Sequence, residues 1–301
     1  MIPENDWYGH KTALSDYLGE SRQDAFLGLM AHGWAPDLAE GVGRRRMTFA
    51  PFFVWNARLL SQAKTEGVRN VHCIGSPFCY LVKDRIPRSV SAGGEGTIIF
   101  PAHSTDGPPI EYETERFIRQ LKDEMPAPFT VSIYYMDSNT AATRAYQEAG
   151  FRVVSFGRRM QSDFLERMAD EIESHATVVS NVAQTSVWYG ALLGKQSRVI
   201  GLGAHPVAPG QEPEVARTRW PALFRSDVTS DEYIALGEEE LGFGYLLEPA
   251  ELRAALGIDS WWKRQAAREI RRAVDSRLER RFRRSGVDID GLSNGQPRLL
   301  G

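Results

Sequence analysis

The chain has little of several features that mark particular classes of protein. It contains two cysteines in 301 residues, Cys73 and Cys79, which could form at most one disulfide and lack the spacing and nearby histidines of a zinc site. Neither sign of charge is in excess, with 36 Lys and Arg against 39 Asp and Glu, which argues against a nucleic-acid backbone as the main partner. The composition, 42% hydrophobic and 25% charged, excludes disordered and fibrous classes.

We also expect neither an export signal nor a membrane anchor from the hydropathy of the sequence. Residues 1–16 lack the basic start and the apolar core of a secretory leader. The longest uncharged stretch, 174–194, contains Asn181 and Gln184, which a membrane-spanning helix tolerates poorly. We therefore expect a soluble, cytoplasmic protein with reduced thiols.

What the sequence does contain is an alternation of β-rich runs and helical patterns in its middle part. Strands are predicted at 97–101, 129–135, 151–156, 177–180 and 198–202. Helices are predicted at 111–125, 138–150 with Ser138 as the N-cap, around 164–172, and at 185–194. The residues expected to face inward are Phe117, Ile118, Leu121 and Met125 on the first helix and Phe164, Leu165, Met168, Ala169 and Ile172 on the third. Five strands separated by four helices predict a parallel, doubly wound α/β sheet.

The N-terminal part shows a sparser version of the same pattern. A strand is predicted at 25–30, a helix at 51–67 and a second strand at 68–75. The side chains expected to face inward on that helix are Phe52, Trp55, Leu59, Leu60 and Ala63. Residues 89–96, SVSAGGEG, have the composition of a linker. These features predict an N-terminal domain over 1–92, a second domain over 93–250 and a C-terminal extension over 251–301.

The C-terminal extension is strongly basic. Between Trp261 and Arg284 there are ten basic and three acidic residues, and apolar residues recur every four positions from Trp262 to Phe282. One interpretation is a terminal helix that packs across the domains with a solvated basic face. The other is attachment to an anionic membrane surface, peripheral to the inner face of the cell membrane.

Polar residues follow several of the predicted strands. Ligands of open parallel sheets bind beyond the carboxyl ends of the strands, so the segments 31–34, 102–107, 136–137 and 180–186 are the places for chemistry. The last segment is the richest, because a loop with Ser, Asn and Thr leads directly into a helix. Free backbone N–H groups and the positive end of the helix dipole favour a phosphate or diphosphate there. Ordinary N-capping by Thr185 or Ser186 would explain one of these residues but not the whole cluster.

The segment SNVAQTSVWYGALLGKQSRVIGL, 180–202, resembles the nucleotide-binding segment of GT-B glycosyltransferases, most closely the polyol-phosphate and capsule polysaccharide transferases. The runs FPAHSTDG and AHGW are similar to histidine-bearing loops of the same enzymes. The resemblance covers about residues 95–205. It implies two Rossmann-like domains facing a cleft, with the nucleotide donor bound mainly in the second domain. An N-terminal domain of about ninety residues is small for this family, which puts the acceptor site in doubt.

The resemblance also implies a reaction and roles for individual residues. A sugar or polyol phosphate would move from a nucleotide-activated donor to a hydroxyl of a glycan acceptor, such as a surface polysaccharide. Histidine is the usual base near neutral pH, so we expect His32 to activate the acceptor and His103 to stabilise the departing phosphate. The residues expected to bind the donor are Ser104, Thr105, Asp137, Arg158, Ser180, Asn181, Thr185 and Ser186. No cofactor is expected beyond the donor, and no metal, because Asp288-Ile289-Asp290 lies in a Gly-rich tail rather than after a central strand.

Two other functions stay open at this point. The run from Asn139 to Phe151 matches the N-x-x-A-x-x-x-Y-x-x-x-G-F pattern of acetyl-coenzyme-A-dependent N-acetyltransferases, but the Gly-rich pyrophosphate loop expected one element earlier is missing from 117–130. The same letters also arise from helix packing alone. The second alternative is a non-catalytic protein that binds a nucleotide or glycan as a partner in polysaccharide assembly. Such a protein would use the phosphate loop without needing His32.

Overall fold

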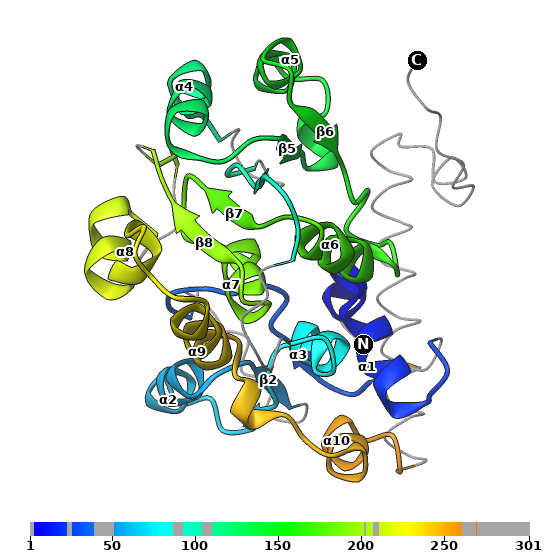
Figure 1. Cartoon of the computed structure of the whole chain (residues 1–301). Coiled ribbons are helices and arrows are strands. Elements are labelled where there is room, and N and C mark those ends of the chain that lie inside the picture. Colours follow the sequence, from blue (N-terminus) through cyan, green and yellow to red (C-terminus); the bar gives the residue numbers. More distant parts are fainter. Residues whose placement is uncertain are drawn as a thin grey trace.

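The computed structural model describes residues 3–22, 26–38, 51–86, 93–103, 110–201, 203–206, 211–260 and residue 269. The basic segment 261–284, apart from residue 269, and the Asp288-Ile289-Asp290 run lie outside the described residues. No helix in the described part of the chain is long and apolar enough to cross a membrane. Two parallel sheets flanked by helices form the architecture, which confirms the predicted α/β class (Figure 1).

The larger sheet has the strand order β6-β5-β4-β7-β8, and every neighbouring pair is parallel. Its strands are β4 (Thr97–Ile99), β5 (Phe129–Ser132), β6 (Arg152–Val154), β7 (Thr177–Ser180) and β8 (Gln196–Val199). Four of them lie within the predicted strands, whereas β8 begins two residues before the predicted 198–202 and ends three residues before its end. The predicted doubly wound sheet is confirmed. The chain starts at β4 in the centre, runs outward through β5 and β6, and returns to place β7 on the other side of β4.

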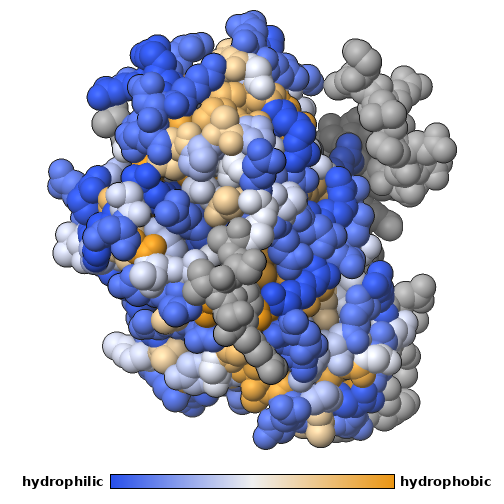
Figure 2. All heavy atoms as spheres, in the orientation of Figure 1, coloured by the Kyte–Doolittle hydropathy of each residue, from blue (hydrophilic) through white to orange (hydrophobic). Residues whose placement is uncertain are grey.

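Helices cover both faces of this sheet, as the alternation of side chains along its strands requires. The four crossover helices are α4 (Thr114–Glu124), α5 (Ala141–Glu148), α6 (Phe164–Glu173) and α7 (Thr185–Leu192). Ile99 and Val179 pack with α4 and α5, whereas their neighbours Ile98 and Val178 pack with α6 and α7. The nine side chains predicted to face inward on α4 and α6, or just after α4, are all buried. In Figure 2 apolar atoms also show at the surface between α4 and α5.

The smaller sheet contains one more strand than predicted. Its order is β1-β2-β3, with β1 (Leu29–Met30), β2 (Phe52–Val54) and β3 (Val71–Cys73) all parallel. The predicted helix over 51–67 was therefore wrong in its first part, because Phe52–Val54 pairs with β3 and α2 (Ala57–Thr65) starts only afterwards. Asn56 separates the two elements by capping α2, with its Oδ1 accepting a bond from the Leu59 N–H at 3.0 Å.

A similar correction applies to the start of α5. Ser138 was predicted as its N-cap, but the structure places Thr140 there, with Oγ1 accepting from the Thr143 N–H at 3.3 Å. The Ser138 hydroxyl instead donates to the Tyr135 carbonyl oxygen at 2.9 Å. A short 3₁₀ turn, Tyr135–Asp137, occupies the residues before it and delays the helix.

Several helices carry no counterpart in the sequence prediction. They are α1 (His10–Leu18), α3 (Pro77–Val82), α8 (Pro213–Arg219), α9 (Ser230–Leu241) and α10 (Pro249–Leu256). Leu252 and Leu256 of α10 pack with the smaller sheet and α1, so the chain returns to its N-terminal part after the larger sheet is complete. The helix α9 lies close against α7, where a Cβ on Gly237 would stand 2.4 Å from the Leu192 nitrogen.

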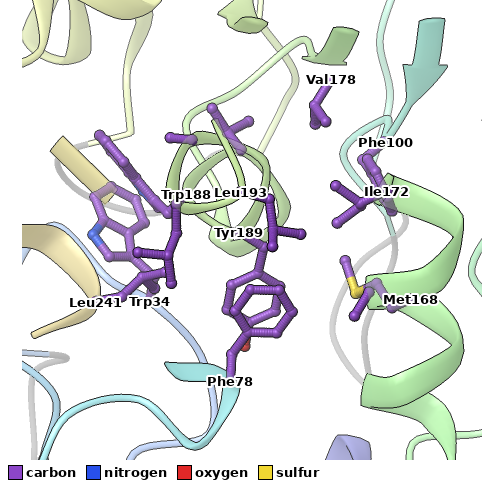
Figure 3. Packing of buried hydrophobic residues seen from close by; sticks show 14 of the residues in the cluster. Trp34, Phe78, Phe100, Met168, Ile172, Val178, Trp188, Tyr189, Leu193 and Leu241 are labelled. Carbon is purple, nitrogen blue, oxygen red and sulfur yellow. The ribbon is translucent and has the colours of Figure 1, made fainter. Parts of the chain in front are cut away.

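The largest buried cluster joins the two sheets. The ring of Phe78, from α3, stacks on the ring of Tyr189, from α7, with centroids 3.8 Å apart and planes 9° apart. Figure 3 shows this pair with Met168 and Ile172 of α6 on one side of α7 and Trp34 and Leu241 on the other. This cluster therefore packs α3 and the residues that follow β1 and β2 against α7 and the larger sheet.

Candidate functional site

A cleft of about 180 Å³ lies at the carboxyl ends of strands from both sheets. In the larger sheet, the residues that line the cleft lie at or just after the ends of four strands. They are 100, 101 and 103 after β4, 132–134 at the end of β5, 155–157 after β6 and 184–186 after β7. From the smaller sheet it takes His32 and Gly33, which follow β1. The strand order of the larger sheet reverses between β4 and β7. The cleft is therefore at the topological switch point, where open α/β sheets bind their ligands.

The N-terminus of α7 forms one wall of this cleft. Its N-cap residue, Gln184, is extended and makes no side-chain cap bond. The Gln184 amide donates instead to the Phe100 carbonyl oxygen at 2.6 Å and to the Ser180 hydroxyl at 2.8 Å. The first N–H groups of a helix have no partner within it, so this end of α7 presents donors and the positive end of the helix dipole to the cleft.

Ser186 and Thr185, at the start of α7, differ in what their hydroxyls do. Thr185 Oγ1 accepts a hydrogen bond from the Trp34 backbone N–H at 3.0 Å, which fixes the loop after β1 against α7. The Ser186 side chain lines the cleft and is 4% exposed, and its hydroxyl has no hydrogen-bond partner within the described part of the chain. An unpaired buried hydroxyl is unfavourable, so a ligand that bonded it would remove that cost.

Ser180 and Asn181 were predicted to bind the donor, but the structure uses their polar atoms for the protein itself. The Ser180 hydroxyl accepts from the Val182 N–H at 3.2 Å and from the Gln184 amide. The Asn181 Oδ1 accepts from the Ala102 N–H at 2.7 Å, and its Nδ2 donates to the Gly203 carbonyl oxygen at 3.2 Å. Both side chains are buried, and neither is among the residues that line the cleft.

His32 lies where the sequence predicts it, directly after β1 and at the edge of the cleft. The ring is exposed and meets the Trp7 ring edge-on, with centroids 4.8 Å apart. The loop that carries it is anchored by Trp34, whose indole N–H donates to Glu240 at 2.7 Å. Glu240 is buried and also accepts from Trp220 and from Arg58, so it fixes this loop rather than facing a ligand.

His103 also lines the cleft, in the segment after β4. Its ring is half-buried and packs on the Tyr134 ring with centroids 4.5 Å apart. This pair separates the cleft from a second cavity of about 350 Å³, which both rings also line. The structure therefore brings both predicted histidines to one cleft, on loops from different sheets.

Of the other predicted donor-binding residues, those that the structure describes, Asp137 and Arg158, do not line this cleft. Ser104 and Thr105 lie outside the described residues. Asp137 lines the second cavity, and its backbone oxygen accepts bonds from the hydroxyls of Thr140 and Thr143. Arg158 is exposed, with its guanidinium 6.0 Å from the centroid of the Tyr135 ring. Among the described residues that line the cleft there is no Lys or Arg.

His10 is a cleft residue that the sequence reasoning missed. It begins α1, is 2% exposed and has an Nδ1 atom without a hydrogen-bond partner in the described structure. Burial lowers the pKa of His10 from 6.5 to about 3, with the nearby His32 as a second cause, so its imidazole is neutral at physiological pH. His10 follows no strand, and no motif in the sequence marks it.

The segment before His10 is held to both sheets. Asn5 donates to the Gly28 carbonyl oxygen and accepts from the Met30 N–H, both at 2.8 Å, which ties it to β1. Tyr8 bonds the Arg159 carbonyl oxygen, beyond β6, through its backbone N–H. Tyr8 has φ +58°, an uncommon conformation for a residue with a side chain, and it lines the cleft. The N-terminal segment thus builds one wall of the site.

The residues that match the acetyltransferase pattern have packing roles in the structure. Tyr146 is fully buried, and its hydroxyl lies 3.2 Å from that of Tyr112. Gly150, just beyond α5, has φ +85°. Phe151 packs against Tyr146 with ring centroids 5.7 Å apart.

Among the described residues, no group of three His, Cys, Asp or Glu side chains is arranged to hold a metal ion.

The chain matches no protein-family model and no curated protein sequence. Among solved structures, a co-structure of S. aureus MnaA with UDP aligns with 70% of this chain at 12% identity and a TM-score of 0.40. The alignment spans 60% of the length of that protein.

Proposed function

We propose that the chain is a GT-B-like transferase, which moves a sugar or polyol phosphate from a nucleotide-activated donor to a hydroxyl of a glycan. Its two domains would meet at the 89–96 segment and share the cleft. The observation that carries the proposal is the N-terminus of α7 at the switch point, which in the described part of the chain has no side-chain cap and a buried Ser186 hydroxyl without a partner.

A phosphate fits this end of α7 for two reasons. The helix offers backbone N–H groups and a positive dipole end, and the Ser186 hydroxyl adds a donor that can turn towards a bound oxygen. The described lining of the cleft contains no Lys or Arg, so binding would rest mainly on hydrogen bonds and the helix dipole.

His32 and His103 supply the chemistry of the proposed transfer. They line the same cleft from loops of different sheets, so an acceptor and a donor held there would lie between them. His32 would take the proton of the attacking acceptor hydroxyl, and the new bond would form as the bond to the nucleotide leaving group breaks. His103 would donate a hydrogen bond to the phosphate oxygen that gains charge.

The proposal is tested by a thermal-shift screen against CDP, UDP, GDP, CMP, ADP and acetyl-coenzyme A. A ligand that binds only the folded state raises the unfolding temperature by mass action. We expect a shift with at least one nucleotide diphosphate. A shift with acetyl-coenzyme A alone would support the acetyltransferase alternative, and no shift with any member would contradict nucleotide binding.

The chain offers a matched control for the phosphate position. Ser197 in β8 is as buried as Ser186 and its hydroxyl is equally unpaired in the described structure, but it does not line the cleft. We expect Ser186→Ala to abolish most of the nucleotide shift and Ser197→Ala to leave it unchanged. Equal losses in both variants would mean that the effect comes from packing.

Turnover separates a transferase from a non-catalytic binding partner. His32 is exposed, so His32→Ala should leave the fold intact. We expect this variant to bind the nucleotide normally and to lose at least about a hundredfold in turnover of the activated donor. Turnover that survives the substitution undiminished would remove His32 from the mechanism.

A further inference from the structure

Within the described structure, the cleft has a second buried polar side chain with an unpartnered atom, at the start of α1. His10 lines the cleft from the start of α1, and its ring is 2% exposed. The ring packs near Trp55, at 5.8 Å between centroids, and near Tyr8, at 6.1 Å. Its Nδ1 has no hydrogen-bond partner in the described part of the chain.

The other buried histidine, His175, differs from His10 in its hydrogen bonds. His175 is buried to a similar degree, at 4% exposure, and lies beyond the end of α6. Its Nε2 bonds the Thr130 hydroxyl at 2.9 Å, and its Nδ1 bonds the Glu171 carbonyl oxygen at 2.7 Å. A buried imidazole that serves packing therefore has partners for both nitrogens, as buried polar groups usually do. In the described structure the Nδ1 of His10 lacks such a partner, at a position where a ligand could supply one.

The charge of His10 limits what that ligand group can be. Burial keeps the imidazole neutral at physiological pH, so it offers one N–H donor and one acceptor nitrogen. A neutral group of this kind suits an uncharged hydroxyl, which can both donate and accept, better than a phosphate oxygen. Anions are favoured instead at the α7 side, where the helix dipole is positive.

The surroundings of His10 agree with a hydroxylated, uncharged ligand group. Tyr8, Phe164 and Tyr189 line the same cleft and offer apolar ring surface. Sites for small molecules combine such surfaces with a few polar groups that set orientation and specificity. His10 and Ser186 are the two buried, unpaired polar side chains that line the cleft within the described structure.

We infer that His10 is a specificity-determining residue whose Nδ1 hydrogen-bonds a hydroxyl of the transferred sugar or polyol. The cleft would then have a phosphate end at Ser186 and a hydroxyl end at His10. The inference rests on the proposed function, because it assigns the two ends of one donor molecule. It adds that recognition of the transferred group depends on the N-terminal segment as well as on the larger sheet.

The test compares pairs of ligands that differ only in the hydroxylated group. UDP is paired with UDP-glucose, and CDP with CDP-glycerol, and the affinity of each is measured by isothermal titration calorimetry. The variants are His10→Phe, which keeps a ring of similar shape without a polar atom, and His10→Asn, which places an amide atom near the position of Nδ1. Ser186→Ala is measured alongside them.

We expect wild-type protein to bind one of these pairs. His10→Phe should weaken the sugar- or polyol-bearing member about tenfold, the loss typical of one hydrogen bond, and change the bare nucleotide by less than about twofold. His10→Asn should recover most of the loss. Ser186→Ala should weaken both members by the same factor, because both carry the phosphate.

The outcomes separate the inference from the proposed function. If the wild-type protein binds neither member of either pair and gives no thermal shift with GDP, CMP or ADP, the proposed function fails and takes the inference with it. A shift with GDP or ADP alone moves the same comparison to that nucleotide and its sugar conjugate. If it binds both members and His10→Phe leaves their ratio unchanged, the inference alone is overturned, whether both affinities fall together or neither falls. Far-UV circular dichroism and a cooperative thermal transition check that each variant is folded before its affinities are compared.

Discussion

Two halves of one polar turn, 180–186, have similar compositions and opposite roles. In the first half, the Asn181 side chain joins the Ala102 N–H to the Gly203 carbonyl oxygen, and the Ser180 hydroxyl holds the turn itself. In the second half, the Ser186 hydroxyl is buried at the cleft without a partner in the described structure. The sequence alone favoured ligand binding for both halves equally. What distinguishes them is whether the protein already satisfies their hydrogen bonds, which only the folded structure reveals.

The largest effect on stability is expected from the first half of the turn. Asn181→Ala would leave the Ala102 N–H and the Gly203 carbonyl oxygen unpaired in the interior. Each unpaired buried group costs about 1–3 kcal/mol, so we expect the free energy of unfolding to fall by about 2–4 kcal/mol in urea denaturation. Asn139→Ala, at an exposed position just before α5, is the control and should change it by less than about 0.5 kcal/mol. A similarly small effect of Asn181→Ala would show that the hydrogen bonds of the first half of the turn do not stabilise the fold.

A second effect concerns His10 and the pH dependence of stability. The folded protein holds the pKa of His10 at about 3, below the ordinary 6.5 of the unfolded chain. Below pH 6.5 the unfolded state therefore binds a proton that the folded state does not, and stability falls as the pH decreases towards 3. Between pH 6.5 and 4.5 this single group should remove about 2 kcal/mol from the free energy of unfolding.

His10→Phe isolates that contribution. Its stability should decline less steeply than that of the wild type over the same pH range, by the same amount of about 2 kcal/mol. Denaturation curves at several pH values for both proteins give the difference directly. Parallel pH profiles would show that His10 titrates alike in the folded and unfolded states, and that it is not a neutral group of the cleft.

A smaller effect is expected at Thr185. This residue belongs to the second half of the turn, but its hydroxyl already has a protein partner, as the side chains of the first half do. Its hydroxyl is occupied by the Trp34 backbone N–H, so Thr185→Val should cost about 1 kcal/mol of stability. Thr185→Ser keeps the hydroxyl and should retain most of the stability. Because this bond fixes the loop of His32, Thr185→Val should also lower turnover. Unchanged stability in the valine variant would mean that the loop is held by Glu240 alone.

The smallest effect on stability is expected at Ser186. The Ser186 hydroxyl has no partner in the described structure, so Ser186→Ala deletes no hydrogen bond and should not lower the free energy of unfolding; relief of the buried, unpaired hydroxyl should leave it equal or raise it by about 1 kcal/mol. Chemical denaturation without ligand measures this value. A loss above about 1 kcal/mol would indicate that the hydroxyl is bonded in the folded protein, and the two halves of the turn would then no longer differ.

The larger sheet could be predicted from the sequence because its signals are local. Inward residues such as Phe117 and Leu165 recur with helical spacing, and the short apolar runs between them match the strands. The smaller sheet was predicted less well, because the apolar run from Phe52 into α2 has no period that separates a buried strand from a helix. Only the cap at Asn56 marks the change.

The candidate site shows the same limit. His32 and His103 could be placed in the cleft because residues that follow parallel strands gather at one edge of a sheet. His10 could not, because it reaches the cleft through contacts of the N-terminal segment with residues far along the chain, such as that of Tyr8 with Arg159. The structural roles of Asn181 and Glu240 likewise depend on partners remote in sequence.

The central claim is that a phosphate binds at the second half of the turn, and backbone amide NMR tests it most directly. UDP and inorganic phosphate are titrated into isotope-labelled protein with assigned amide signals, and the two halves of the turn are compared. The account predicts saturable shifts of the Thr185 and Ser186 amide signals and much smaller ones at Ser180 and Asn181. Shifts centred on Ser180 and Asn181, or no saturable shift anywhere in the turn, would contradict it.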